Sequence, residues 1–178
     1  EIRTPMNGVI GMSNLLLETP LNKKQYGFAK TVKNSGESLL AIINDILDFS
    51  KVEAGMLEIE AIDFEMDLMM QEFISSMAFH AHEKGLDLIY PTEAMQNQWF
   101  SADPGRIRQI LNNLVGNAIK FTQNGEVAVH CTVQVQTKSR SLVRIEVIDT
   151  GIGISTAKQA QLFERFNQVD GSTTRKYG

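Results

Sequence analysis

Cysteine is almost absent from this sequence, and its scarcity excludes two kinds of stabilisation. The 178 residues include one cysteine, Cys131. A disulfide within the chain is therefore impossible, and a zinc site built on a cysteine cluster is excluded as well. A single thiol fits a reducing compartment, so we expect the chain to work in the cytoplasm.

Long apolar runs and a surplus of positive charge are also missing. No stretch could span a bilayer, and no signal peptide is visible. The net charge of −4 argues against a nucleic-acid partner, because proteins that bind nucleic acids usually have a basic face. The sequence begins at Glu1 within a helical pattern, so we expect a part of a longer protein. Membrane contact, such as an anchor in the inner membrane, would then belong to segments outside this sequence.

The three histidines do not have the spacing of a metal site. His80 and His82 are two residues apart in a predicted helix and therefore point to different sides. His130 falls on the polar side of a predicted strand, where Cys131 is in phase with the valines. We therefore interpret the histidines as surface residues and the cysteine as a small core residue.

The first third of the chain predicts a helical hairpin. Residues 1–17 and 23–52 have helical periodicity, and Pro20 breaks the pattern between them. Apolar residues in the longer helix alternate by three and four, as in a coiled-coil seam, at Ala29, Val32, Gly36, Leu39, Ile43 and Ile46. Further apolar residues widen this stripe beyond what one partner helix covers. We therefore favour a homodimer with a four-helix bundle over packing of the stripe on the chain's own second half.

A change of period near residue 55 predicts a second domain. Residues 1–55 then form the hairpin, and residues 56–178 form an α+β domain. Alternating residues predict strands at 57–64, 86–90, 127–135 and 143–147, and helical patterns cover 67–84 and 103–122. Gly55 and Gly85 are expected to end the helices before them.

The helix at 103–122 carries two contrasting stripes. Asp103 is placed to cap it, and Pro104 suits its first position. The core stripe consists of Ile107, Ile110, Leu111, Leu114 and Ala118, and the polar stripe consists of Arg106, Gln109, Asn113, Asn117 and Lys120. Asparagine is a mediocre helix former, so two of them one turn apart suggest a function. Amide oxygens suit Mg²⁺ on a substrate phosphate, and a lysine can meet phosphate charge; an ordinary solvated face is the alternative.

A glycine turn follows the last predicted strand. Asp149 ends the strand, and Gly151 and Gly153 allow a backbone to approach a flat ligand closely. The aspartate is an acceptor that could bind an exocyclic amine such as that of adenine. A dinucleotide-binding turn is disfavoured because Thr156 occupies the third glycine position and no parallel strand-helix-strand unit follows. The sequence has no Walker A motif.

Four segments in this order resemble the motifs of one family. Residues 1–8 resemble the segment after a phosphorylated histidine, and residues 113–122 resemble an asparagine box. Residues 149–153 resemble a first glycine box, and residues 162–166 resemble a phenylalanine box. The chain is thus similar to the catalytic core of a sensor histidine kinase of two-component signalling, of the hybrid type. This resemblance implies a dimerisation and phosphotransfer hairpin followed by a Bergerat-type ATP-binding sandwich.

The resemblance also implies roles for residues on the 103–122 helix and beyond it. Asn117 would be the main Mg²⁺ ligand, Asn113 would lie near the phosphates of ATP, and Lys120 would meet their charge. Phe166 would anchor the lid over the nucleotide. The expected ligands are therefore ATP and Mg²⁺.

Further roles concern the glycine turn and the start of the hairpin. Asp149 would accept from the adenine amine, in a pocket shaped by Gly151 and Gly153. Glu1 resembles the acid that assists the phosphorylated histidine, and Thr4 resembles the residue that orients water for dephosphorylation of a partner. That partner would be the receiver domain of a response regulator, which takes the phosphoryl group on an aspartate.

The resemblance also places two family features outside this sequence. The acceptor histidine is expected just before Glu1, and the second glycine box after Gly178, so the sandwich is incomplete and truncated within the lid. The sequence alone therefore predicts no autophosphorylation by the 178 residues. Two alternatives remain open, another Bergerat-fold ATPase and a non-catalytic dimeric scaffold, and the segment 1–8 with its hairpin argues against the first.

Overall fold

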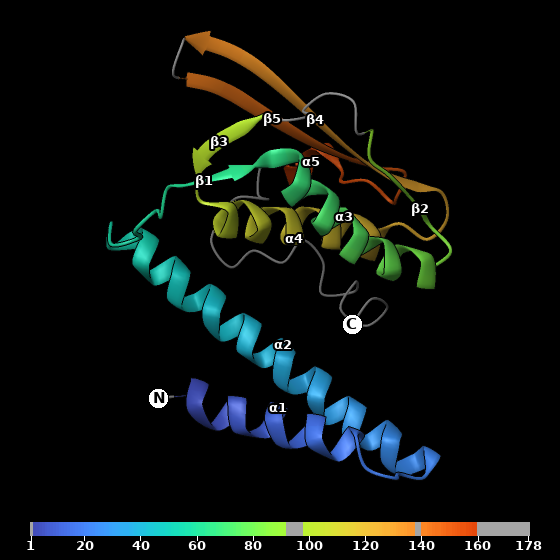
Figure 1. Cartoon of the computed structure of the whole chain (residues 1–178). Coiled ribbons are helices and arrows are strands. Elements are labelled where there is room, and N and C mark those ends of the chain that lie inside the picture. The colour runs from blue at the N-terminus through green and yellow to red at the C-terminus, as the bar shows by residue number, and fades with distance from the viewer. Residues whose placement is uncertain (1, 92–97, 138–139, 160–178) are drawn as a thin grey trace. The chain divides into compact units, whose positions relative to one another are not determined.

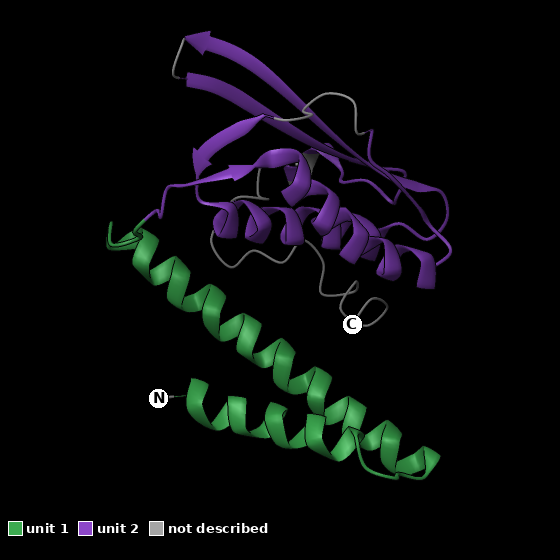
Figure 2. Ribbon diagram, viewed as in Figure 1, with its two compact units in different colours: residues 1–58 green, residues 59–178 purple. Residues whose placement is uncertain are grey.

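The computed structural model describes residues 2–91, 98–137 and 140–159. The chain divides into two compact units, residues 1–58 and residues 59–178 (Figure 2). Within the described residues, the helices are too short or too polar to cross a membrane. The two units owe their stability to different kinds of packing.

Unit 1 is the helical hairpin that the periodicity predicts. Helix α1 spans Arg3–Leu17 and helix α2 spans Lys23–Glu53 (Figure 1). The start of α2 is fixed by a capping box, because the Asn22 side chain accepts from the Gln25 amide at 2.9 Å while the Gln25 side chain accepts from the Asn22 amide at 3.0 Å. Gly55, at φ 64°, follows the end of α2 as predicted.

The predicted apolar seam of α2 divides into two sets of residues. Ala29 and Gly36 are buried. A Cβ atom on Gly36 would lie 3.1 Å from Cγ1 of Ile10, so the two helices cross closely there. The other half of the seam stays exposed, at 49%, 45% and 52% for Val32, Leu39 and Ile46. One partner helix therefore covers only part of the stripe.

Unit 2 contains two sheets and a layer of helices. Its elements are β1 Ile62–Glu65, α3 Met66–Glu83, β2 Asp87–Ile89, β3 Trp99–Ala102, α4 Pro104–Phe121, β4 Glu126–Thr137, β5 Arg140–Asp149 and α5 Thr156–Gln159. Strand β1 pairs antiparallel with β3, while β2 is parallel to β4, and β4 is antiparallel to β5. Figure 1 shows α3 and α4 on one face of the three-stranded sheet. This α+β arrangement agrees with the predicted class.

The core of unit 2 lies between the helices and the three-stranded sheet. It is built mainly from α3, α4 and β4, with Met66, Met69, Met70, Phe73, Leu111, Val115, Ile119, Val127, Val129 and Cys131 among its buried residues. Cys131 is 5% exposed, and its burial raises the pKa of the thiol to about 11. The prediction that this cysteine is a core residue is confirmed.

Two strand predictions differ from the structure. The strand expected at 57–64 is confined to Ile62–Glu65, because its pairing partner β3 offers only four residues, Trp99–Ala102. Strand β3 itself was not predicted. Its partner is separated from it by α3 and β2, so the pairing that stabilises β3 leaves no local signature in the sequence.

Candidate functional site

The start of α4 is fixed by Asp103, as predicted. Its Oδ1 accepts from the backbone amide of Arg106 at 2.9 Å, and its Oδ2 accepts from the amide of Glu60 at 3.2 Å. The bond from Arg106 is the main cause that lowers the pKa of Asp103, and desolvation opposes it. The carboxylate therefore satisfies a free amide of the helix and ties a distant segment to it.

The polar stripe of α4 lies opposite the face that enters the core. Leu111, Val115 and Ala118 are buried, whereas Asn113 and Asn117 are exposed. Lys120 is half-buried, and its Nζ lies 5.7 Å from the centroid of the Phe121 ring. Two amides and an ammonium therefore follow one another along one side of the helix. This arrangement suits the binding of an anionic ligand with its metal ion, as the sequence predicts.

The predicted core stripe of α4 is wrong at two positions. Ile110 is 59% exposed and Leu114 is 48% exposed. The buried face is instead completed by Val115 and Ile119, which the prediction omits. Ile110 and Leu114 have the three- and four-residue spacing of a helix face, so the predicted period is correct. The error is in the direction of the buried face, which the prediction rotates about the helix axis. These two side chains instead lie beside the exposed asparagines.

The turn after β5 is shaped by Asp149 and its glycines. The Asp149 Oδ1 accepts from the Gly151 amide at 2.9 Å, which makes an Asx turn. A Cβ atom on Gly151 would lie 2.7 Å from the carbonyl oxygen of Phe121 and 2.8 Å from Oδ1 of Asp149. Gly153 has a φ of 64°, which a residue with a side chain rarely adopts. The protein's own packing therefore requires glycine at 151, and backbone conformation favours it at 153.

The glycine turn meets the C-terminal end of α4. The Ile152 amide donates to the carbonyl of Phe121 at 3.4 Å. Phe121 directly follows Lys120, and Asn117 lies about one turn earlier in the same helix. The structure thus brings the elements that carry Lys120 and Asp149 together at one end of α4, with packed side chains of the core on the other face of the helix.

Thr150 is a residue of this turn that the sequence analysis missed. Its hydroxyl oxygen accepts from the Glu126 amide at 3.0 Å, and its own amide donates to the Glu126 carbonyl at 3.2 Å. Gly125 has a φ of 112°, and a Cβ atom there would overlap the Thr150 hydroxyl. Thr150 therefore joins the turn before β4 to the turn after β5. Only the Asn124-Gly125 turn signal could have been read from the sequence.

The donors and acceptors at the end of α4 fit a nucleotide with its metal ion. Two exposed amides and an ammonium suit a metal-bound phosphate chain, because amide oxygens can bind Mg²⁺ and an ammonium can meet phosphate charge. Asp149 uses one carboxylate oxygen for the Gly151 amide, and a carboxylate has a second oxygen that can accept from an exocyclic amine. Within the described residues, groups of three or more histidine, cysteine, aspartate or glutamate side chains able to hold a metal are not found.

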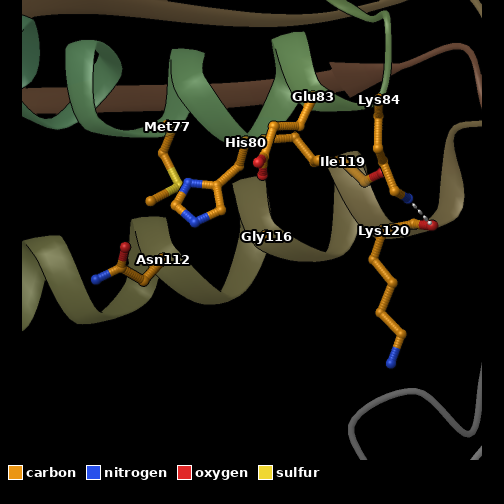
Figure 3. Close-up of a pocket in the computed structure, with 8 residues that line it drawn as sticks. All are labelled: Met77, His80, Glu83, Lys84, Asn112, Gly116, Ile119 and Lys120. Carbon is orange, nitrogen blue, oxygen red and sulfur yellow. Dashed lines mark hydrogen bonds between the residues drawn. The ribbon is translucent and has the colours of Figure 1, made fainter. Parts of the chain in front are cut away.

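A groove of about 620 Å³ lies beside α4 but is a different feature. It runs between α3 and α4, and Figure 3 shows the side chains that line it, which are Met77, His80, Glu83, Lys84, Asn112, Gly116, Ile119 and Lys120. Of the predicted site residues that the structure describes, only Lys120 belongs to this lining. The groove therefore does not join Asn117 to Asp149.

The start of the hairpin carries the remaining predicted residues. Thr4 is exposed in the first turn of α1. Its neighbour Arg3 donates through Nε and Nη2 to Oδ1 of Asn44, at 2.9 and 2.6 Å, and so ties the beginning of α1 to α2. Glu1 and Phe166 lie outside the described residues, and the roles of all three predicted residues stay predictions.

Two family models match the chain. The His Kinase A (phospho-acceptor) domain matches residues 1–55. The model described as histidine kinase-, DNA gyrase B-, and HSP90-like ATPase matches residues 102–178. The first match covers the hairpin, and the second begins just before α4 and includes the glycine turn.

Curated relatives and solved structures agree with these matches. The chain is 41% identical over its full length to hybrid signal transduction histidine kinase L of Dictyostelium discoideum, and 42% identical to signal transduction histidine-protein kinase BarA of Escherichia coli K12. It spans 10% and 19% of the lengths of these two relatives. The crystal structure of full-length ShkA in complex with AMPPNP is 35% identical, with a TM-score of 0.72, over 96% of this chain and 36% of that one.

Proposed function

The chain belongs to the sensor histidine kinases of two-component signalling, and we propose that its parent protein phosphorylates one of its own histidines from ATP. The acceptor histidine is the residue expected immediately before Glu1. The phosphoryl group then passes to an aspartate in the receiver domain of a response regulator. The observation that carries this proposal is the meeting of the glycine turn with the end of α4, through the Ile152 amide and the Phe121 carbonyl.

The proposed nucleotide site consists of residues from α4 and the turn after β5. Asn117 would hold Mg²⁺, Asn113 would lie beside the phosphates, and Lys120 would neutralise their charge. Asp149 would accept from the adenine amine, with Gly151 and Gly153 shaping that side, and Phe166 would anchor a lid. ATP would supply the phosphoryl group, and its Mg²⁺ would neutralise part of the negative charge on the phosphates. The chain's own contribution is to position the phosphates and stabilise developing charge.

The hairpin would contribute the phosphoacceptor chemistry. Glu1 would accept a proton from the adjacent histidine, which makes its nitrogen a better nucleophile. Thr4 lies in the first turn of α1 and would orient water when the partner aspartate is dephosphorylated. The bond between Arg3 and Asn44 supports this proposal because it holds the start of α1 against α2.

We propose a homodimer through the exposed half of the hairpin's apolar stripe. Val32, Leu39 and Ile46 recur every seven residues and are each about half exposed. A second copy of the hairpin would cover them in a four-helix bundle. A two-fold axis would bring the same stripe from both protomers together.

The test is Asn117→Ala in the protein with its natural flanking sequence. Loss of the amide removes the proposed Mg²⁺ ligand, so we expect the rate of histidine phosphorylation to fall by at least about 100-fold. Asn112→Ala is the matched control, because Asn112 is exposed on the same helix but faces the groove beside α3. Labelled phosphate on histidine is the readout, and it should be normal in the control.

Three results would overturn the proposal in different ways. An unchanged rate in Asn117→Ala would show that Asn117 is not the metal ligand. Phosphate release without phosphohistidine would indicate a simple ATPase. Calorimetry with Mg²⁺-ATP that detects no binding heat in the unsubstituted protein would indicate a non-catalytic scaffold.

A further inference from the structure

The last turn of α4 is closed by groups that come from several parts of unit 2. A helix leaves its last four carbonyls without partners inside the helix. The Ala118 carbonyl accepts from Thr122, through the amide at 3.0 Å and the hydroxyl at 2.8 Å. The carbonyls of Ile119 and Lys120 accept from the ammonium of Lys84, at 2.8 and 2.9 Å. The Phe121 carbonyl accepts from the Ile152 amide, so all four carbonyls have partners.

Lys84 is well placed to make these two bonds. It is the C-cap residue that directly follows α3, and Gly85, at φ 71°, turns the chain immediately afterwards. The Leu86 amide donates to the Ala81 carbonyl at 3.0 Å, so the backbone around Lys84 is itself fixed. In Figure 3 the Lys84 ammonium points at the Lys120 carbonyl, while the Lys120 side chain extends away from it. A cation at the negative end of the α4 dipole is favourable, and charge-assisted bonds strengthen the contact.

The turn that Lys84 holds is also the turn that joins both halves of the proposed nucleotide site. One carbonyl bound by Lys84 belongs to Lys120, whose side chain is the proposed phosphate contact. The next carbonyl, that of Phe121, accepts a hydrogen bond from the Ile152 amide. It also lies so close to Gly151 that a Cβ atom on residue 151 would not fit. A shift of this carbonyl would therefore move the turn that begins at Asp149.

We propose that Lys84 is a positioning residue for the nucleotide site. It holds the C-terminal turn of α4 so that Lys120 and the glycine turn after Asp149 keep a common geometry. It acts through the backbone of α4 and is not proposed to touch the nucleotide. This inference rests on the proposed function, because it assigns Lys84 a role in the site that the function requires.

The experiment compares three variants in the protein with its natural flanking sequence. Lys84→Met keeps the aliphatic stem but removes the charge and both donors, whereas Lys84→Arg keeps them. Lys30→Met is the matched control, since Lys30 is exposed on α2 and loses the same charge in the other unit. The measurements are the dissociation constant of Mg²⁺-ATP by calorimetry and, without nucleotide, the hydrogen exchange of the Thr122 and Ile152 amides.

We expect Lys84→Met to weaken Mg²⁺-ATP binding by about 10-fold, because two charge-assisted bonds to the helix end are lost. The amides of Thr122 and Ile152 should exchange faster in this variant even without nucleotide. Lys84→Arg should bind within about 3-fold of the unsubstituted protein, since its guanidinium can still donate to both carbonyls. Lys30→Met should change neither measurement.

Asn117→Ala, measured in parallel, separates failure of this inference from failure of the proposed function. Normal affinity and exchange in Lys84→Met, with binding lost in Asn117→Ala, would overturn the role of Lys84 alone. Normal binding in both would overturn the proposed site. If the Trp99 fluorescence shows that Lys84→Met is unfolded, Lys84→Gln replaces it. A folded Lys84→Gln that binds normally, or a Lys84→Arg no better than the methionine variant, would then overturn the inference.

Discussion

The two units of this chain bury their apolar side chains in different ways. Unit 2 encloses a core within itself, where Met70, Val115, Val127 and Val129 are fully buried. In the described part of unit 1 only small side chains are buried, those of Ser13 and Ala29, together with Gly36, while many of the larger apolar residues stay exposed. A hairpin of two helices has too little interior to cover large side chains on both sides.

This difference implies different sources of stability for the two units. Unit 2 gains its hydrophobic stabilisation from contacts within one chain, so its unfolding should not depend on protein concentration. If a second copy covers the hairpin, part of the stability of unit 1 comes from association and grows with concentration. Substitutions in the two units can test whether the contrast holds.

The largest effect is expected for Phe73→Ala in unit 2. Phe73 is 2% exposed in α3, and removal of a buried aromatic side chain typically costs about 3–5 kcal/mol of unfolding free energy. Urea unfolding followed through Trp99, the single tryptophan, reports on unit 2. Phe79→Ala is the control, since Phe79 is 65% exposed on the same helix. Equal effects of the two substitutions would contradict the assigned core.

A somewhat smaller effect is expected for Leu39→Asp in unit 1. In a two-fold dimer, each protomer would lose a buried leucine and gain a carboxylate at the interface, so the dimer dissociation constant should rise at least about 100-fold. Asn34→Asp adds the same charge on the polar face of α2 and should leave association unchanged. Sedimentation over a range of concentrations measures both. A monomer without any substitution would disprove the dimer.

Two glycines of α2 provide a test of the hairpin's internal contact. A Cβ atom on Gly27 would meet no neighbouring atom within 4 Å, so Gly27→Ala should stabilise the helix by roughly 0.5–1 kcal/mol. Gly36→Ala places its methyl 3.1 Å from Ile10 and should lose that gain, which leaves the variants at least about 0.5 kcal/mol apart. Thermal unfolding followed by helical circular dichroism at one concentration makes the comparison. Equal stabilisation would mean that the helices do not cross at Gly36.

Local signals in the sequence predicted the helices well. The Asp103 cap with Pro104 located the start of α4, and Gly55 and Gly85 located the ends of two helices, because caps and left-handed glycines depend on a few adjacent residues. Strand β3 depends on pairing with β1 across α3 and was missed. The exposure of Ile110 and Leu114 depends on which face of α4 meets the sheet, which periodicity alone did not resolve.

The candidate site shows the same limit of local information. Asn113, Asn117, Lys120 and Asp149 were proposed from their residue types, their spacing and their match to the family's motifs, and their roles stay predictions. Lys84 was not identified, because its ammonium binds carbonyls 35 and 36 positions further along the chain. A surface lysine at the end of a helix has no feature that reveals such a contact before the fold is known.

Raising the pH is expected to lower the stability of unit 2. Burial raises the pKa of Cys131 to about 11, and burial with the nearby Asp67 carboxylate raises the pKa of Tyr90 to about 12. Both values exceed those of an unfolded chain, so the stability that the neutral groups contribute is complete below about pH 8.5 and is lost as the pH rises through the folded values. The urea midpoint reported by Trp99 should therefore decline above about pH 9. Cys131→Ala should delay that decline towards about pH 10, the ordinary pKa of tyrosine, and an identical pH profile would show that the thiol is not buried.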